Sequence, residues 1–356
     1  MNISQLKAIQ QNFVKELQDA KNGKKTSLPF IVHMLATSSI VRDREVFQSL
    51  VVGGTMAKFA SVKKEASEPQ AFRIKEQQLS FRTEEDFLGF VESILLQDIN
   101  VVSLNFAYPL KPIFENGRLD GILLSVTKEG GFHGLVGKKV GEEIEKYVLA
   151  KRRKRIKVSV ANDTICLLLS GLTKYQWDNL AAGIVGTGLN FAFFLDKEKA
   201  VNLESANFDK FPLSEEGKII DSQSAKKGKA WFEKETAGAY LYKHFNLIIK
   251  EKKIKYPQIA STEELDIISR KNISQVSEIA KSLITRSAQL VAAQIAGITE
   301  LKKRDTVFNM EGSLFWKANN YKETVGKTVK QLVPEYKVRF VEIEDSAILG
   351  AAKLVT

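Results

Sequence analysis

The chain has 356 residues, of which 44% are hydrophobic and 27% are charged, and its formal net charge is +11. This composition is ordinary for a soluble globular protein, and the length predicts two domains, each with its own core. No window approaches about eighteen uninterrupted apolar residues, and the N-terminus lacks a signal-peptide core, so we expect a soluble, cytoplasmic protein without stable membrane insertion.

The first predicted element is an amphipathic helix over residues 3–21, which Asn22-Gly23 ends. Its apolar positions recur at steps of three and four: Ile3, Leu6, Ile9, Phe13 and Leu17. Such a helix can anchor a protein to a membrane surface or dock on the protein body. Because its polar face mixes acids and lysines, we expect residues 1–23 to dock on the body.

Alternating apolar residues and turn residues predict a mainly stranded region next. Residues 46–52 and 57–62 form strands around the turn Gly53-Gly54-Thr55. A helix begins at Thr83, with acids in its first turn, and another covers residues 136–150. The first half is therefore predicted to be an α/β unit of about five strands, with further strands at 72–81, 101–106, 121–126 and 156–161.

The net positive charge is scattered along the chain except in one run, Lys151-Arg152-Arg153-Lys154-Arg155. We interpret this run as a solvated helix C-terminus, where cations complement the helix dipole. A patch for nucleic acid or another anionic surface is the alternative. No aromatic residues interleave the run and no nucleic-acid-binding motif is present, so we expect no nucleic-acid partner.

Asn162 and Asp163 follow the predicted strand at 156–161, and residues 165–169 are apolar enough to pack a helix on that strand. An amide and a carboxylate at a strand end lie where α/β sheets bind their ligands. Asp163 suits a general base for a hydroxyl proton, with Asn162 hydrogen-bonding the same ligand. The alternative is an aspartate that only caps the following helix.

The second half repeats the pattern of strand, glycine turn and strand. Residues 182–185 and 190–195 flank the turn Gly186-Thr187-Gly188. Residues 253–274 form a charged connecting stretch. The remaining predicted elements are helices at about 229–252, 275–303, 322–332 and 347–354, and strands at 306–310 and 337–343.

Each half thus has one turn of glycine and threonine between two apolar strands. Glycine lets backbone N–H groups approach a phosphate, and the threonine hydroxyl adds a donor. One such turn is weak evidence, because hairpins use glycine in any case. Two turns, each followed by a strand and not a helix, argue against a P-loop or Rossmann site and fit a duplicated fold that clamps a nucleotide phosphate chain between two lobes.

Cysteine and histidine give no sign of a metal site. Cys166 is the single cysteine, so no intrachain disulfide can form, and its apolar surroundings in the sequence predict a small core residue. His33, His133 and His244 lack the spacing of metal ligands. We therefore expect no metal ligands among the protein side chains.

Several short segments follow one another in a defined order along the chain. They are Leu28-Pro29, 50–55, 104–109, Thr127-Lys128, 160–164, 184–190, 201–204, 228–234, 311–313, Glu344-Asp345 and 350–352. In this order they resemble the hexokinase family of the actin-like ATPase (ribonuclease H-like) fold, over about residues 28–355. The resemblance implies a two-lobed α/β fold with a mixed sheet in each lobe: a small lobe at 24–161 and a large lobe at 162–356, whose last helix, about 347–355, packs near the small lobe.

The resemblance also implies a site for a hexose, ATP and Mg²⁺. Asp163 would be the general base and Lys128 would face the transferring phosphoryl group. The side chains implied in sugar binding are Thr127, Lys128, Asn162, Asp163, Asn190, Glu204 and Glu233. The residues implied in nucleotide binding are Gly53, Gly54, Thr55, Gly186, Thr187, Gly188, Gly312 and Ser313, with Mg²⁺ bridging the phosphates and not bound by protein side chains.

The chain departs from the family pattern mainly at the nucleotide end. Val51 stands where hexokinases have an aspartate two residues before the glycines. Met56-Ala57-Lys58 replaces the family's Asn-Phe-Arg segment after the loop, and only the positive charge is kept, by Lys58. Ala107 replaces a serine, and Ser205-Ala206 replaces a Trp-Gly pair. The segment before the last helix also differs, because it is Ser346-Ala347-Ile348-Leu349.

Three functions remain open from the sequence. The first is an ATP-dependent kinase that phosphorylates the 6-hydroxyl of a hexose such as glucose, which Asp163 and Lys128 favour. The second is a weak or inactive homologue that binds sugar as a sensor or regulator, which Val51 favours. The third is a related kinase for another hydroxylated substrate. The sequence does not predict the preferred hexose, the phosphoryl donor, the oligomeric state or allosteric control.

Overall fold

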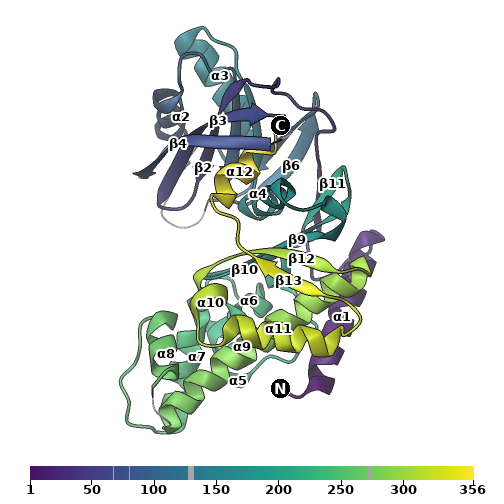
Figure 1. Cartoon of the computed structure of the whole chain (residues 1–356). Coiled ribbons are helices and arrows are strands. Elements are labelled where there is room, and N and C mark those ends of the chain that lie inside the picture. The colour runs from purple at the N-terminus through teal and green to yellow at the C-terminus, as the bar shows by residue number, and fades with distance from the viewer. Residues whose placement is uncertain (67, 80, 127–131, 272–273) are drawn as a thin grey trace. The chain divides into compact units, whose positions relative to one another are not determined.

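The computed structural model describes residues 1–66, 68–79, 81–126, 132–271 and 274–356, and they form two compact units (Figure 1). Unit 1 comprises Met1–Phe30, Gly183–Phe191 and Leu203–Val341; unit 2 comprises Ile31–Ala182, Ala192–Asn202 and Glu342–Thr356. The chain therefore crosses between the units five times, after Phe30, Ala182, Phe191, Asn202 and Val341. None of the helices in the described ranges has the length and apolar character needed to cross a membrane.

Unit 2 contains a mixed five-stranded sheet in the order β4-β3-β2-β5-β8. Strands β2, β5 and β8 are parallel, whereas β3 and β4 are antiparallel to their neighbours. The predicted α/β unit of about five strands is confirmed. The strands are β2 (Val46–Val52), β3 (Met56–Glu65), β4 (Glu68–Gln78), β5 (Val101–Phe106) and β8 (Lys157–Ala161).

Two helices bury their apolar faces in the core of this sheet: α2 (Glu84–Ile94) and α3 (Val140–Arg152). Helix α2 begins where the sequence predicts, because the Thr83 hydroxyl accepts a hydrogen bond from the Asp86 N–H at 3.1 Å. A hairpin of β6 (Leu110–Glu115) and β7 (Arg118–Leu123) also belongs to unit 2. The sequence predicted only the second strand of this hairpin.

The basic run ends α3 but is more tightly held than a solvated helix end. Arg152 pairs with Glu92 of α2 and donates to the Leu95 carbonyl at 2.7 Å. Arg153 is the left-handed C-cap, with φ 53°, and Lys154 donates to the Gln97 carbonyl. These cations therefore stabilise the α2–α3 contact as well as the helix end.

Helices α4 (Asp163–Ser170) and α12 (Ser346–Ala352) pack against each other in unit 2. Their backbones approach closely at Gly350, where an added Cβ would lie 1.8 Å from the Cys166 carbonyl oxygen. Cys166 is fully buried, as predicted. A short 3-10 turn, η1 (Gly171–Thr173), follows α4.

Unit 2 also holds β1 (Ile31–Met34) and β11 (Lys199–Asn202), which pair antiparallel, and the second part of β10 (Leu189–Asp196), which pairs antiparallel with β11. The first part of β10 belongs to unit 1, as do the last three residues of β9 (Leu180–Val185). In unit 1, β12 (Thr306–Glu311) and β13 (Val338–Val341) pair in parallel.

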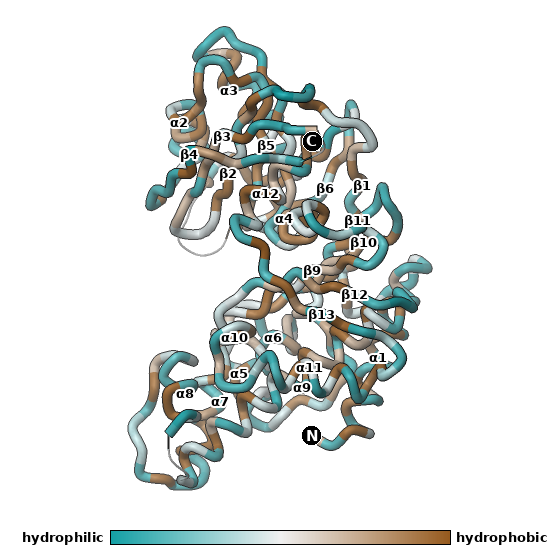
Figure 2. Tube along the Cα trace, in the orientation of Figure 1, coloured by the Kyte–Doolittle hydropathy of each residue, from teal (hydrophilic) through white to brown (hydrophobic). Residues whose placement is uncertain are grey.

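Unit 1 is largely helical around α9 (Gln275–Lys302), most of whose second half is buried. Helix α1 (Ile3–Lys21) alternates hydrophilic and hydrophobic residues along its length (Figure 2) and packs on α9, where Gly297 makes room for Phe13. The other helices of unit 1 are α5 (Glu215–Gln223), α6 (Trp231–Thr236), α7 (Gly238–Glu251), α8 (Thr262–Ser269), α10 (Ser313–Lys317), α11 (Tyr321–Leu332) and the 3-10 turn η3 (Ser205–Asn207); η2 (Trp177–Asn179) lies in unit 2.

Two predictions about unit 1 are wrong. The helix predicted over 229–252 is two helices, α6 and α7, because Ala237 between them is extended with ψ 154°. The connecting stretch at 253–274 contains α8. The division into lobes at 24–161 and 162–356 differs from the division into units and stays a prediction.

Candidate functional site

The end of β8 places Asn162 and Asp163 at the start of α4. Asn162 is the N-cap of the helix: its side-chain oxygen accepts a hydrogen bond from the Ile165 N–H at 3.1 Å. Asp163 is the first helical residue and is therefore not the cap. The capping role that the sequence left open for Asp163 is thus taken by Asn162.

The Asp163 carboxylate is held through one of its two oxygens. Oδ1 accepts hydrogen bonds from the Thr164 N–H at 2.7 Å and from the Thr164 hydroxyl at 3.2 Å. Oδ2 makes no hydrogen bond within the part of the chain that the structure describes. Burial raises the pKa of Asp163 above its usual range, and the Thr164 hydrogen bonds partly oppose this shift. An oriented carboxylate with one unused oxygen and a raised pKa is suited to accept a proton.

A row of residues crosses the five-stranded sheet and ends beside this carboxylate. Cross-strand partners share one face of a sheet. The row runs through Glu76, Lys58, Val51, Asn105 and Ala161, the last residue of β8. It therefore connects the strands around the first glycine turn with the strand that presents Asp163.

The cation in this row is already paired. Lys58 Nζ lies 2.7 Å from Asp345 Oδ1 and 3.5 Å from Glu76 Oε1. The hydrogen bond with Asp345 is the main cause that raises the pKa of Lys58. Val51, directly opposite Lys58 on β2, supplies no charge.

The turn Gly53-Gly54-Thr55 joins β2 to β3, as predicted. The Gly53 N–H donates to the Met56 carbonyl at 3.0 Å, and the Tyr108 hydroxyl donates to the Gly53 carbonyl at 3.2 Å. Neither glycine has a positive φ, and a Cβ on Gly54 would meet no atom within 4 Å. The protein itself therefore does not require glycine at position 54, and the space beside it is open to a ligand.

Three predicted sugar-binding residues lie together in unit 1. Asn190 Nδ2 is 3.4 Å from Glu204 Oε1, and Asn190 Oδ1 accepts hydrogen bonds from the Phe191 N–H at 2.8 Å and the Ser205 N–H at 3.2 Å. Glu204 has a left-handed backbone, with φ 50°, which is costly for a residue that is not glycine. These contacts fix the orientation of the Asn190 amide beside two carboxylates.

Glu233 completes this group from the first turn of α6. Its Oε2 accepts a hydrogen bond from the Leu189 N–H at 3.2 Å. Burial is the largest cause that raises the pKa of Glu233, and the negative charge of Glu204 acts in the same direction. Two nearby carboxylates and an amide match a ligand that presents several hydroxyl groups, because a hydroxyl both donates and accepts.

The second glycine turn is packed between two other segments of unit 1. The Gly238 N–H donates to the Gly186 carbonyl at 2.8 Å, and the Ala239 N–H donates to the Thr187 carbonyl at 3.1 Å. Gly312 has φ 116°, and its Cβ would lie 2.2 Å from the Val185 carbonyl oxygen. The predicted nucleotide-binding residues of this unit therefore lie together at the start of α7 and the end of β12.

A cavity of about 520 Å³ opens beside this turn. Its walls come from the turn itself, the start of α7, helix α8 and helix α10. Gly186, Thr187 and Ser313 line it, as predicted for a nucleotide site, and the volume lies within the usual range for small-molecule sites. Ile267 of α8 and Leu314 of α10 give part of the wall an apolar surface.

Helix α8 and its N-cap contribute residues to this cavity that were not predicted from the sequence: Ser261, Thr262, Glu263, Asp266 and Ile267. The signal for α8 was present, because Ser261 is followed three residues later by Glu264. Ser261 is indeed the N-cap and accepts from the Glu264 N–H at 3.2 Å.

The predicted site residues are divided between the two units, and two of them lie outside the described residues. Asn162, Asp163, Gly53, Gly54 and Thr55 belong to unit 2, and Asn190, Glu204, Glu233, Gly186, Thr187, Gly188, Gly312 and Ser313 belong to unit 1. Thr127 and Lys128 lie outside the described residues. Within those residues, no group of three or more histidine, cysteine, aspartate or glutamate side chains is placed to hold a metal ion.

Comparisons with known proteins point to one family. A family model described as Hexokinase matches residues 250–356. Hexokinase-1 of Spinacia oleracea is 25% identical over 71% of this chain, and Hexokinase-1 of Nicotiana tabacum is 26% identical over 68%. The matched region spans 63% and 62% of the length of these two relatives. The hexokinase of Kluyveromyces lactis is 21% identical over 98% of this chain and 87% of its own length.

Solved structures agree on the fold. A hexokinase from Schistosoma mansoni complexed with glucose has a TM-score of 0.77 at 19% identity, covering 100% of this chain and 95% of its own. A ROK family glucokinase from Streptomyces griseus, in complex with glucose and AMPPNP, has a TM-score of 0.61 at 13% identity, covering 87% and 99%. Together with the mixed sheet and the two glycine turns, these similarities show that the chain has the actin-like ATPase fold, and its sequence similarity supports the hexokinase family.

Proposed function

We propose that this protein transfers the γ-phosphoryl group of ATP to the 6-hydroxyl of a hexose such as glucose. The observation that carries the proposal is the Asp163 carboxylate, anchored through Oδ1 by Thr164 while Oδ2 accepts no hydrogen bond from the described residues. In the proposed mechanism Oδ2 accepts the proton of the sugar hydroxyl as its oxygen attacks the phosphorus. The raised pKa of Asp163 makes it a stronger base than an exposed aspartate.

The proposed sugar recognition rests on polar side chains. The Glu204 and Glu233 carboxylates would accept hydrogen bonds from ring hydroxyls, and the Asn190 amide nitrogen would donate to them. Asn162 is a further predicted sugar-binding side chain. A hydroxyl buried without a partner costs about 1–3 kcal/mol, so several fixed partners select a hydroxylated ligand. Thr127 and Lys128 remain predicted members of this set. The glucose complex of the similar Schistosoma mansoni hexokinase supports a hexose as the substrate.

The cavity beside the second glycine turn is the proposed place for the adenosine part of ATP. The AMPPNP complex of the similar Streptomyces griseus glucokinase supports a nucleotide triphosphate as the donor. Gly53, Gly54 and Thr55 would offer backbone N–H groups and a hydroxyl to the phosphates. When bound with ATP, Mg²⁺ would neutralise phosphate charge, and these glycine turns would orient the phosphates. A cytoplasmic location is part of the same proposal.

The proposal is tested by Asp163→Asn, which keeps the shape of the side chain and removes the base. Turnover should fall by roughly 10²-fold or more, while hexose affinity, measured by calorimetry, should change far less. In the unmodified protein, kcat/KM should also fall with decreasing pH through a pKa above the usual aspartate range, because the base must be deprotonated. Near-full turnover of the variant would show that Asp163 is not the base.

A catalytically weak or inactive sugar sensor is the second candidate. Val51 favours it, because no carboxylate lies at this position of the phosphate loop and because Lys58 opposite is engaged with Asp345. ADP release from purified protein with glucose and Mg-ATP separates the two candidates. Glucose-dependent ADP release supports the kinase, whereas hexose binding without ADP release supports the sensor.

A further inference from the structure

Asn207 joins the two segments of unit 1 that carry the proposed sugar-binding carboxylates. It is the last residue of η3, the 3-10 turn that directly follows Glu204. Its Nδ2 donates to the Glu204 carbonyl at 3.1 Å, and its Oδ1 accepts a hydrogen bond from the Ala230 N–H at 3.3 Å. Because Ala230 is the N-cap of α6, which carries Glu233, one amide connects the backbones that present both carboxylates.

Both residues that the Asn207 amide contacts have an unfavourable backbone conformation. Glu204 and Ala230 are left-handed, with φ values of 50° and 52°. This conformation is costly for a residue that is not glycine and persists only where the surroundings fix it. Neither Glu204 nor Ala230 caps its helix with its own side chain. The hydrogen bonds of the Asn207 amide therefore stabilise the backbone at both positions.

A buried ammonium group fixes α6 itself. Lys234 Nζ belongs to a side chain with 0% exposure and lies 2.5 Å from Asp221 Oδ1. It also donates to the Lys226 and Lys229 carbonyls, at 2.7 Å and 2.8 Å. These three acceptors use all the N–H groups of the ammonium. Helix α6 is therefore anchored on segment 226–229, and the hydrogen bond at its N-cap ties the neighbouring turn to a fixed helix.

The two carboxylates converge on the start of β10. Glu233 Oε2 accepts a hydrogen bond from the Leu189 N–H at 3.2 Å, and Glu204 Oε1 lies 3.4 Å from Asn190 Nδ2. A hydroxyl group hydrogen-bonds an oxygen over only about 2.5–3.0 Å. A sugar that contacts both carboxylates therefore needs them at a fixed spacing.

We propose that Asn207 is a positioning residue for hexose binding, whose amide sets the spacing of the Glu204 and Glu233 carboxylates. The inference rests on the proposed sugar site but not on phosphoryl transfer. Asn207 acts through the two carboxylates and not as a sugar ligand, since its amide nitrogen and oxygen both bond the protein backbone.

The experiment measures glucose binding to the full chain by titration calorimetry without ATP, so it applies to a kinase and to a sensor alike. Asn207→Ala removes both hydrogen bonds and should weaken glucose binding about tenfold. Asn207→Asp keeps the acceptor for the Ala230 N–H but places an oxygen against the Glu204 carbonyl, so it should weaken binding at least as much. In a kinase assay the KM for glucose should rise while kcat changes less than about twofold, because binding to substrate and transition state is lost equally.

Asn246 provides a matched control in the same unit. Its Nδ2 donates to the Ile259 carbonyl at 2.8 Å, and its Oδ1 accepts from the Ile259 N–H at 3.0 Å. It therefore makes the same two kinds of bond from α7, outside the segments that carry the carboxylates. Asn246→Ala should lower the melting temperature about as much as Asn207→Ala and leave glucose binding unchanged.

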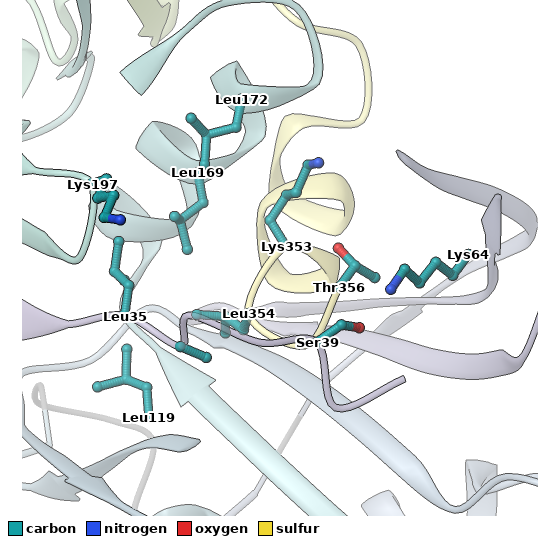
Figure 3. A pocket seen from close by; sticks show the side chains of 11 residues that line it. Leu35, Ser39, Lys64, Leu119, Leu169, Leu172, Lys197, Lys353, Leu354 and Thr356 are labelled. Atoms are coloured by element: carbon teal, nitrogen blue, oxygen red, sulfur yellow. The ribbon is translucent and has the colours of Figure 1, made fainter. Parts of the chain in front are cut away.

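Ser39 provides a control in unit 2. Its hydroxyl donates to the Val355 carbonyl at 3.0 Å. It lines a cavity of about 350 Å³ (Figure 3), to which no described residue of the predicted site contributes. Ser39→Ala should likewise leave glucose binding unchanged.

The outcomes separate the positioning role from the proposed function. Unchanged glucose affinity in both Asn207 variants, or an equal loss of affinity in Asn207→Ala and Asn246→Ala, would overturn the positioning role and leave the proposed function standing. An unmodified protein that binds no glucose would contradict the proposed sugar site and this inference together. Melting temperatures check that each variant is folded.

Discussion

In unit 1, the turn Gly186-Thr187-Gly188 is packed against the start of α7 and the end of β12, whereas in unit 2 a Cβ on Gly54 would meet nothing within 4 Å. Both turns have glycine and threonine between strands. Glycine is needed at Gly186, Gly238 and Gly312 because three backbone segments meet there. Gly54 is not needed by the chain itself. The same sequence pattern therefore has a packing cause in one unit and points to ligand access in the other.

The largest effect on stability should come from Gly312→Ala, which adds one methyl group beside the packed turn Gly186-Thr187-Gly188. Its φ of 116° disfavours alanine, and the new Cβ would lie 2.2 Å from the Val185 carbonyl oxygen. We expect the free energy of unfolding to fall by about 3 kcal/mol or more, measured by urea denaturation. The control is Gly54→Ala, which should change it by less than about 0.5 kcal/mol. A similar loss in both variants would remove the distinction between the two turns.

Gly54→Ala should instead act on nucleotide use, if the proposed function holds. The added methyl group would hinder the approach of a phosphate to the backbone N–H groups. We expect the KM for ATP to rise about tenfold, equivalent to about 1.4 kcal/mol. Gly326→Ala in α11, where the nearest atom would be 3.8 Å away, is the matched control and should leave the KM unchanged. An unaltered KM in Gly54→Ala would mean that phosphates do not approach this turn.

Val51→Asp tests whether the open turn has lost a carboxylate. The structure places Lys58 directly opposite, where it already pairs with Asp345 and Glu76, so the new carboxylate would join an existing charge cluster and should change stability by less than about 1 kcal/mol. We expect the KM for ATP to fall roughly threefold, because the carboxylate can orient water of the metal–phosphate complex. Val51→Asn, without the charge, should show no gain. Reduced activity together with a lower melting temperature would indicate a rebuilt nucleotide site instead.

The smallest effect concerns the ion pair between Lys58 and Asp345. Asp345→Asn should lower the free energy of unfolding by about 0.5–1 kcal/mol, because the pair is largely shielded from water but not fully buried. The pKa of Lys58 is raised, so the pair's contribution is fully present below the unfolded-state pKa of about 10.4 and is lost as pH rises through the higher folded-state value. Urea denaturation at neutral pH and at a series of higher pH values should therefore show the difference in free energy of unfolding between the variant and the original protein shrinking as Lys58 loses its proton. A difference that persists at high pH would assign the stability to packing and not to charge.

Local sequence patterns were sufficient for many elements of the fold. Strand β5 has the predicted bounds, Thr83 caps α2, and α1 covers the predicted residues, because alternation, capping residues and helical periodicity are properties of neighbouring positions. The break at Ala237 was not predictable in this way. It lies just before Gly238, whose N–H donates to the Gly186 carbonyl, a partner 52 positions earlier in the chain.

The candidate site shows the same limit. The strand end at Ala161 and the helix after Asp163 were predicted, but the choice of Asn162 as cap and the anchoring of only one Asp163 oxygen depend on side-chain geometry. The contact between Glu233 and the Leu189 N–H joins α6 to β10 and has no signal in the sequence. Burial, which raises the pKa of Asp163 and Glu233, is likewise a property of the folded chain.

The contact of Gly350 with the Cys166 carbonyl has a consequence for biosynthesis. Helix α12 packs on α4, β2 and β5, which are all encoded in the first half of the chain. A ribosome adds about 5–20 residues per second, so these earlier elements wait many seconds for their last partner. Throughout that interval the nascent chain exposes the apolar surface around α4 that α12 later covers. This surface is where we expect chaperones to bind during translation, and the folding of unit 2 is completed only after residue 352 has left the ribosomal tunnel.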